Sequence, residues 1–126
     1  MVIIGKGEFG LTLHAPDTAR EHGVEHRIDV VAGPFSGTFV VDAYENPYQQ
    51  IAGGLENLYA SLSGEVVPHQ FENMMLKFIG DGRGHINVPV RIMLREKGIE
   101  LKFAIEVDQT ELPAIIMSIR ETFLAS

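Results

Sequence analysis

Strict alternation of apolar and polar residues over two neighbouring segments is the feature that most limits what this chain can fold into. In residues 85–94, HINVPVRIML, every second side chain is apolar, from Ile86 to Leu94. After a turn at residues 96–98, the same alternation runs from Ile99 to Val107. Successive side chains of a strand point to opposite faces, so the pattern predicts two antiparallel strands with one buried face and one solvated face.

The hydrophobic period changes directly after Asp108. The next apolar residues are spaced by three or four and are Leu112, Ile115, Ile116, Ile119 and Phe123. This spacing is typical of the apolar stripe of a helix. Asp108 or Thr110 can cap the helix, and Glu111 stands three residues after Asp108, as a capping box requires. We therefore interpret the DQTE sequence as a strand-to-helix junction and not as a catalytic cluster.

The preceding residues contain four further strand patterns and one helix pattern. Alternation predicts strands at residues 8–14, 24–33, 35–44 and 71–80. A helix is predicted between Asn46-Pro47, a favoured N-cap followed by a proline at the first helical position, and Gly64, a candidate left-handed C-cap. Gly53-Gly54 inside this helix predicts close packing against a strand, because glycine otherwise costs about 1 kcal/mol per residue.

These segments together predict the fold class. We expect a single α+β domain over residues 1–126, built from an antiparallel sheet of about six to seven strands and two helices in the order β-β-β-α-β-β-β-α. The chain has no cysteine, which excludes disulfides and a thiol nucleophile. The first apolar run, Val2 to Ile4, is too short for a secretory signal, and no stretch approaches a membrane span. A cytoplasmic protein that does not enter membranes is expected.

Charge is distributed unevenly along the chain. The net charge is −7, and no Lys or Arg occurs between Arg27 and Lys77. Six carboxylates fall in that gap: Asp29, Asp42, Glu45, Glu56, Glu65 and Glu72. Such a segment repels a phosphate backbone, so nucleic-acid binding is not expected. It attracts a basic protein partner and speeds the encounter, although an acidic surface also simply favours solubility.

No motif in the sequence predicts a catalytic, metal or cofactor site. His22 and His26 have a spacing that suits zinc on a helix, but Gly23 lies between them and His26 begins a predicted strand, while His14 could join them only across a hairpin. GKGEFG and GDGRG are interpreted as turns, since neither has the frame of a phosphate loop. Glu100 and Glu106 alternate with Lys102, which is typical of a cross-strand salt lattice. We expect a protein that is not an enzyme and that needs no cofactor.

The order of these motifs resembles that of a known family. An FSG strand is followed by a helix I-x3-L-x2-LY-x2-L-x-G, an E-x3-L-x-F strand, a D-x-x-G turn, I-x-V and L-x-F strands and a DQT-x-L helix start. The matching residues are Phe35, Ser36, Gly37, Leu55, Leu58, Leu62, Gly64, Glu72, Leu76, Phe78, Asp81, Gly84, Ile86, Val88, Leu101, Phe103, Asp108, Gln109, Thr110 and Leu112. Over about residues 24–124 the chain resembles the WapI-type immunity proteins of bacterial polymorphic toxin systems.

This resemblance implies a non-catalytic protein that neutralises a cognate toxin by binding it. A basic toxin would be steered to an acidic inhibitor by charge. The hypothesis therefore places the partner-binding surface in the segment without basic residues. Its candidate residues are Asp42, Glu45, Gln49, Glu56 and Glu65.

The alternative hypothesis is a small ligand- or peptide-binding module. The apolar side chains of Met75, Ile79 and Met93 fall on what should be the outward faces of their strands. An exposed apolar patch of this kind marks a contact surface or a second layer over the sheet. Either a monomer or a weak homodimer is compatible with the sequence.

Overall fold

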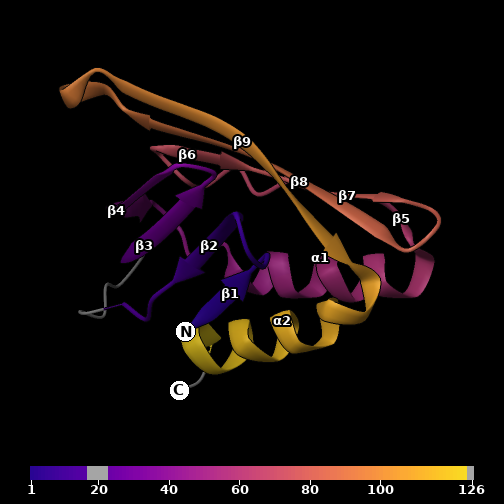
Figure 1. Cartoon of the computed structure of the whole chain (residues 1–126). Coiled ribbons are helices and arrows are strands. Elements are labelled where there is room, and N and C mark those ends of the chain that lie inside the picture. The colour runs from indigo at the N-terminus through magenta and orange to yellow at the C-terminus, as the bar shows by residue number, and fades with distance from the viewer. Residues whose placement is uncertain (17–22, 125–126) are drawn as a thin grey trace.

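The computed structural model describes residues 1–16 and 23–124, which form two antiparallel sheets and two α-helices (Figure 1). The strands are β1 (Val2–Ile4), β2 (Phe9–Leu13), β3 (Val24–Ala32), β4 (Phe35–Ala43), β5 (Ser63–Val66), β6 (Met74–Leu76), β7 (Phe78–Asp81), β8 (His85–Leu94) and β9 (Ile99–Asp108). The helices are α1 (Tyr48–Ser61) and α2 (Leu112–Ile119), with short helical segments η1 (Arg95–Lys97), η2 (Gln109–Glu111) and η3 (Arg120–Leu124). The predicted α+β class is confirmed. The prediction of one sheet with six to seven strands is corrected to nine strands in two sheets over the described residues.

Sheet A has the strand order β1-β2-β3-β4. β3 and β4, both predicted as strands, form a hairpin that is paired from Val24 opposite Ala43 to Ala32 opposite Phe35. The alternation of these strands places one apolar face in the core, since every second residue of β3, such as Ile28 and Val30, is buried. β1 was missed because three apolar residues are too short a run to show a period, and its register comes from pairing with β2.

Sheet B is centred on β8, which pairs with β9 on one side and with β6 and β7 on the other. The strand predicted at residues 71–80 is divided at Lys77, which lies opposite Pro89 of β8. The Lys77 amide donates to the Pro89 carbonyl over 3.3 Å, but proline has no N–H to donate in return. This missing hydrogen bond lies where β6 ends and β7 begins. β5 pairs only with β7, and β9 pairs only with β8, so each forms an edge of the sheet.

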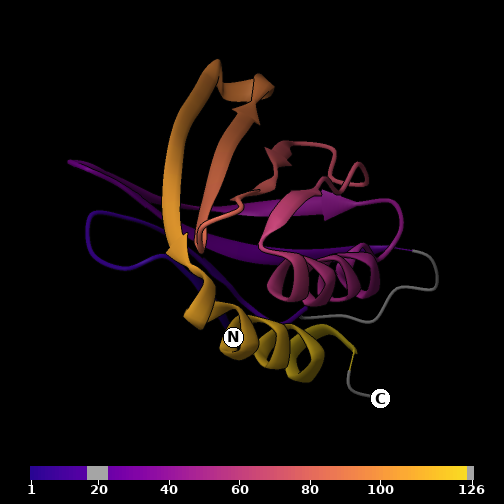
Figure 2. The ribbon, with the colours of Figure 1, turned by 90° about the vertical axis from the view of Figure 1, so that its right-hand side faces the viewer.

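The two helices lie together on one side of the molecule (Figure 1). α1 packs on β5, α2 packs on β1, and the helices contact each other. The view in Figure 2 shows the β8–β9 hairpin rising away from the helices, while the β3–β4 hairpin extends in another direction. Buried side chains from both sheets and both helices form one continuous cluster. The inner face of sheet B contributes to this cluster, and its outer face has no covering element in the described part of the chain (Figure 1).

The DQTE sequence is the predicted strand-to-helix junction. The Asp108 side chain accepts a hydrogen bond from the Thr110 amide over 2.9 Å, and the Glu111 carboxylate accepts one from the Asp108 amide over 2.7 Å. Both halves of a capping box are therefore present. The helix begins in a short 3₁₀ turn, and Pro113 follows in the first turn of α2, where its missing N–H costs nothing. The structural interpretation of this sequence is confirmed.

The ends of α1 differ from the prediction. The helix begins at Tyr48, with Pro47 in the N-cap position, and the Asn46 side chain accepts the Tyr48 amide over 3.0 Å. The left-handed residue at the C-terminal end is Leu62, with a φ of 65°, and not Gly64. The Leu62 amide bonds the Leu58 carbonyl, as in a left-handed helix C-cap, and the chain then turns into β5.

The two glycines of α1 have different surroundings. A Cβ added to Gly54 would lie 2.8 Å and 3.0 Å from the two methyl groups of Val66 on β5, whereas nothing lies within 4 Å of a Cβ added to Gly53. The predicted close packing against a strand is therefore confirmed for Gly54 and wrong for Gly53.

Alanine substitutions at these two neighbouring positions should have opposite effects. Gly53→Ala is expected to raise the free energy of unfolding by about 1 kcal/mol, because the helix gains propensity without a clash. Gly54→Ala is expected to lower it by about 1–3 kcal/mol, because Val66 is β-branched and cannot move aside cheaply. Urea denaturation of both variants checks this prediction, which is contradicted if the two changes have the same sign.

Candidate functional site

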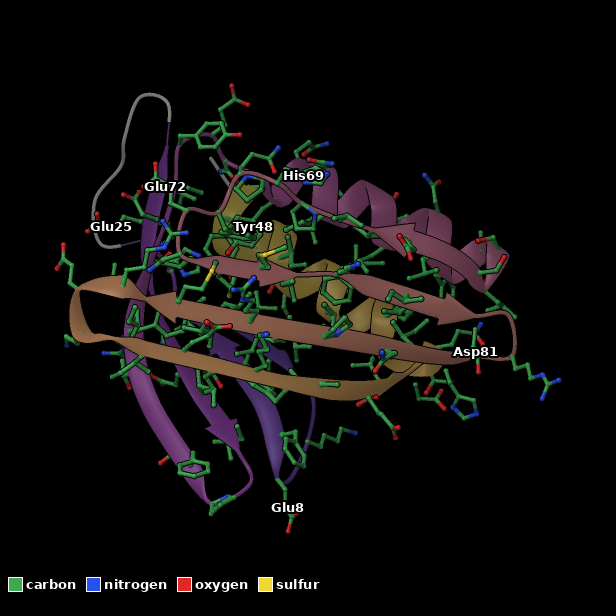
Figure 3. All side chains as sticks on the ribbon, turned by 90° about the horizontal axis from the view of Figure 1, so that it is seen from above. Glu8, Glu25, Tyr48, His69, Glu72 and Asp81 are labelled. Atoms are coloured by element: carbon green, nitrogen blue, oxygen red, sulfur yellow. The ribbon has the colours of Figure 1, made fainter. Side chains whose placement is uncertain are left out.

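A groove of about 730 Å³ lies on the outer face of sheet B. Its floor comes from β6, β8 and β9, and its side wall comes from the segment that joins β5 to β6. Figure 3 looks onto this face, with His69 labelled on the wall. The location is notable because the opposite face of the same strands is buried in the core.

The register of sheet B places particular side chains on the groove floor. Met75 of β6 lies opposite Arg91 of β8, which lies opposite Lys102 of β9, so these three form one row across the sheet. Lys77 and Pro89 form the next row and also line the groove. The alternation of the strands directs all five side chains outward. The predicted outward position of Met75 is confirmed, since 52% of its surface is exposed.

Three cationic side chains border the groove: Lys77, Arg91 and Lys102. Glu100 lies closer than these residues to the turn between β8 and β9, and its carboxylate is 2.9 Å from Arg91 and 3.4 Å from Lys102. The hydrogen bond from Arg91, followed by that from Lys102, lowers the pKa of the Glu100 carboxyl. One carboxylate is thus shared by two cations, and Lys77 has no ion-pair partner among the described residues.

The wall of the groove is apolar and is fixed to other parts of the fold. Val67, Pro68 and Phe71 line it, and the Phe71 ring packs edge-on against Tyr48 of α1 at a centroid distance of 6.1 Å. Phe71 also forms a β-bridge with Ala43 at the end of β4. The wall is therefore held in place by α1 and sheet A before any ligand binds.

Further hydrogen bonds join the end of the wall to β4. The Glu72 amide donates to the Asp42 carbonyl over 2.8 Å, and the Asn73 side-chain amide donates to the Val40 carbonyl over 2.8 Å. The Asn73 side-chain oxygen also accepts the Asp42 amide over 3.3 Å. These contacts connect the two sheets and position β6 next to the wall.

A second hollow, of about 690 Å³, lies at the other end of sheet B, near the turn between β7 and β8. Asp81, labelled in Figure 3, accepts the amides of Arg83 and His85 over 2.7 Å and 3.2 Å. The bond from Arg83 is the main cause of the lowered pKa of Asp81. Asp108 and Glu111, which also line this hollow, belong to the capping box. These carboxylates are occupied in shaping a turn and a helix end.

His26 and Tyr48 form a buried polar pair inside the core. The Tyr48 hydroxyl lies 2.5 Å from His26 Nε2, and His26 Nδ1 lies 3.3 Å from the Arg27 carbonyl. A carbonyl only accepts, so Nδ1 carries the proton and Nε2 accepts the hydroxyl. Burial lowers the pKa of His26 to about 4, outweighing the bond to Arg27, and raises that of Tyr48. This pair is enclosed by side chains and joins β3 to α1.

The remaining histidine prediction concerned zinc. His14 lies 2.7 Å from an Asp29 carboxylate oxygen on the outer face of sheet A, and the other oxygen of that carboxylate accepts the Thr38 hydroxyl over 2.9 Å. The bond from His14 is the main cause of the lowered pKa of Asp29. His26 is buried away from this cluster, and His22 lies outside the described residues. Among the described residues, no group of three or more His, Asp or Glu is arranged to hold a metal ion.

The five predicted partner-binding residues come from two strands, one turn and one helix. Asp42 is on β4 and Glu45 follows it in the turn before α1, whereas Glu65 is on β5, next to Val66, which packs against Gly54 in the middle of α1. Gln49 and Glu56 are exposed on α1, and the Glu56 carboxylate pairs with Arg120 of η3. Glu56 therefore has a cationic neighbour, and the candidate residues are distributed over two strands, a turn and a helix.

Sequence reasoning identified part of the groove and missed the rest. Met75, Ile79 and Met93 do lie on the outer face of sheet B, opposite Arg91, Asn87 and Glu100. The predicted salt lattice is present for Glu100 and Lys102. The signal for the cationic row was available in the alternation, since Lys77, Arg91 and Lys102 all occupy polar positions of their strands. The apolar wall at residues 67–71 carried no periodic signal.

Comparison of the chain with family models finds no match, and comparisons with curated proteins and with solved structures find none either. The resemblance to WapI-type immunity proteins stays a prediction. In the described part of the chain, neither helix has the length and apolar character needed to cross a membrane.

Proposed function

We propose that this chain is a non-catalytic protein-binding module. The observation that carries the proposal is the uncovered outer face of sheet B, which combines an apolar groove with a cationic border. The groove wall is fixed by α1 and β4, so little ordering entropy is lost when a partner binds. Exposed apolar side chains on a sheet that is otherwise polar are typical of a contact surface.

The biological role that we propose is that of an immunity protein which neutralises a bacterial toxin. The support for this role is the order of motifs in the sequence together with a surface suited to a protein partner. The net charge of −7 favours rapid association with a basic toxin domain, because long-range steering depends on the summed charge.

Co-expression with a toxin domain tests this role. We expect the chain to restore growth of cells that express the toxic C-terminal domain encoded next to it, and to elute with that domain as a complex of fixed stoichiometry. The combined variant Asp42→Lys, Glu45→Lys and Glu56→Lys should slow association with a basic toxin. The exposed ion pair between Glu56 and Arg120 contributes little to stability, so its loss should lower the melting temperature only slightly. Failure to restore growth or to form a complex would contradict the proposed role.

Self-association through the same face is a second candidate function. Met75, Ile79 and Met93 lie on this face, and a second copy would cover them. Sedimentation of the purified protein at increasing concentration distinguishes the two candidates. A rise in mass that is abolished by Met75→Lys would favour the homodimer, and a constant monomer mass would favour a different partner.

A further inference from the structure

We propose that the groove on sheet B binds an extended segment of the partner protein in which apolar side chains alternate with carboxylates. This inference rests on the proposed function, and it specifies the chemistry that one site recognises. It differs from the expectation drawn from net charge, because a basic toxin would have to present a locally acidic segment at this position.

The first argument is charge complementarity. Lys77, Arg91 and Lys102 border the groove, and Glu100 is the carboxylate that pairs with two of them in the described part of the chain. The border of the groove is therefore locally positive, although the chain as a whole has a net charge of −7. Carboxylates of a bound segment would pair with Lys77 and displace or share the contacts of Glu100. Because Lys77 has no carboxylate partner among the described residues, pairing it does not break an existing bond.

The second argument is the position of the apolar surface. Met75 is exposed on the floor, and Val67, Pro68 and Phe71 form the wall on the side away from Lys102. A segment lying along β8 therefore has the apolar wall on the β6 side and Lys102 on the β9 side, while Lys77 lies on the β6 side next to the wall. An extended peptide with alternating apolar and acidic residues can direct its apolar side chains to the wall and its carboxylates toward Arg91 and Lys102. A carboxylate next to the wall would pair with Lys77.

The arrangement disfavours the main alternative polymer. Nucleic acid would meet Glu65, Glu106, Asp108 and Asp81, which line or flank the same face beyond the groove. A phosphate backbone running along the face would be repelled at that end, whereas a short acidic segment confined to the groove would not reach it.

The experiment uses fluorescent octapeptides of defined sequence with the intact chain. The test peptide alternates Asp with Leu, a second alternates Lys with Leu, and a third alternates Asp with Ser. Fluorescence anisotropy should show saturable binding of the Asp-Leu peptide and at least about fivefold weaker binding of the other two, because each lacks one of the two complementary features. Raising the salt concentration should weaken the binding, as expected for exposed charges.

Matched variants locate the site. Lys77→Glu should weaken binding of the Asp-Leu peptide by about tenfold. Lys97→Glu makes the same charge change at the distant tip of the β8–β9 hairpin and should weaken binding by less than about twofold. Both residues are exposed, so both variants are expected to fold, and circular dichroism confirms it.

Several results would overturn the inference. Equal or tighter binding of the Lys-Leu peptide would do so, and so would equal effects of Lys77→Glu and Lys97→Glu. Saturable binding of dodecanoate at the groove without binding of the Asp-Leu peptide would assign the site to a lipid instead. If the co-expressed toxin is neutralised but its complex is unaffected by Lys77→Glu and the peptide does not bind, this inference fails while the proposed function stands. If the peptide binds as expected and no toxin is neutralised, the inference stands and the proposed role fails.

Discussion

Replacing Phe123 with alanine is expected to lower the free energy of unfolding by about 3–5 kcal/mol, the range typical of a buried phenylalanine. Only 9% of the Phe123 side chain is exposed. Its ring stacks on Tyr48 at a centroid distance of 3.7 Å and an interplanar angle of 6°, and it lies 4.7 Å from the His26 ring. Removing it would leave a cavity between α1, β3 and the end of the chain. Chemical denaturation measures the loss directly.

The control for this prediction is Phe35→Ala. Phe35 stands at the start of β4 with 66% of its surface exposed, so the same chemical change should alter the free energy of unfolding by less than about 1 kcal/mol. Similar losses for both variants would contradict the assignment of Phe123 to the core.

The second large effect is a pH dependence that comes from His26. Burial lowers the pKa of this imidazole to about 4 in the folded state, from the value of 6.5 that an exposed histidine has. The unfolded chain therefore binds a proton at a higher pH than the folded chain. The contribution of neutral His26 is complete above pH 6.5 and is lost as the pH falls toward 4, which amounts to about 3 kcal/mol for a shift of this size.

Urea denaturation at a series of pH values between these limits checks the prediction. The variant His26→Gln keeps a polar group at this position but does not titrate, so its stability should fall less steeply over the same interval. Parallel pH profiles for the two proteins would contradict the role of His26. Asp29, Asp81, Glu100 and Asp108 have pKa values lowered by hydrogen bonds, so their contributions are lost at lower pH and fall largely outside this interval.

The sequence allowed the long strands and the second helix to be predicted because their determinants are local, whereas the short strands β1 and β5 were missed. Alternation places Ile86 and Val88 on the buried face whatever the rest of the chain does, and the Asp108–Glu111 capping box needs only residues within one turn. The division into two sheets could not be predicted in this way. It depends on which strands pair in space, and β4 meets the segment before β6 only through an isolated bridge between Ala43 and Phe71 in the described part of the chain.

The part of the candidate site that depends on strand alternation was predictable, and the part that depends on tertiary packing was not. The outward position of Met75 follows from the period of its strand, and so does that of Lys77. The apolar wall depends on the loop at residues 67–71, which packs against Tyr48 and β4 only after the chain has folded. The ion pair between Glu56 and Arg120 has a similar cause, since η3 is far from α1 in sequence and meets it only in the folded chain.

The position of β9 at the edge of sheet B affects how the protein resists aggregation. Over the described residues, the ten-residue strand β9 pairs with β8 on one side and with no strand on the other, and a long open edge of this kind is a template for strands from other molecules. β9 carries Glu100, Lys102 and Glu106 at alternate positions of one face. Another β9 strand stacked in identical register would place like charges opposite each other, which disfavours fibril growth and leaves this edge available only to a strand whose charges are complementary.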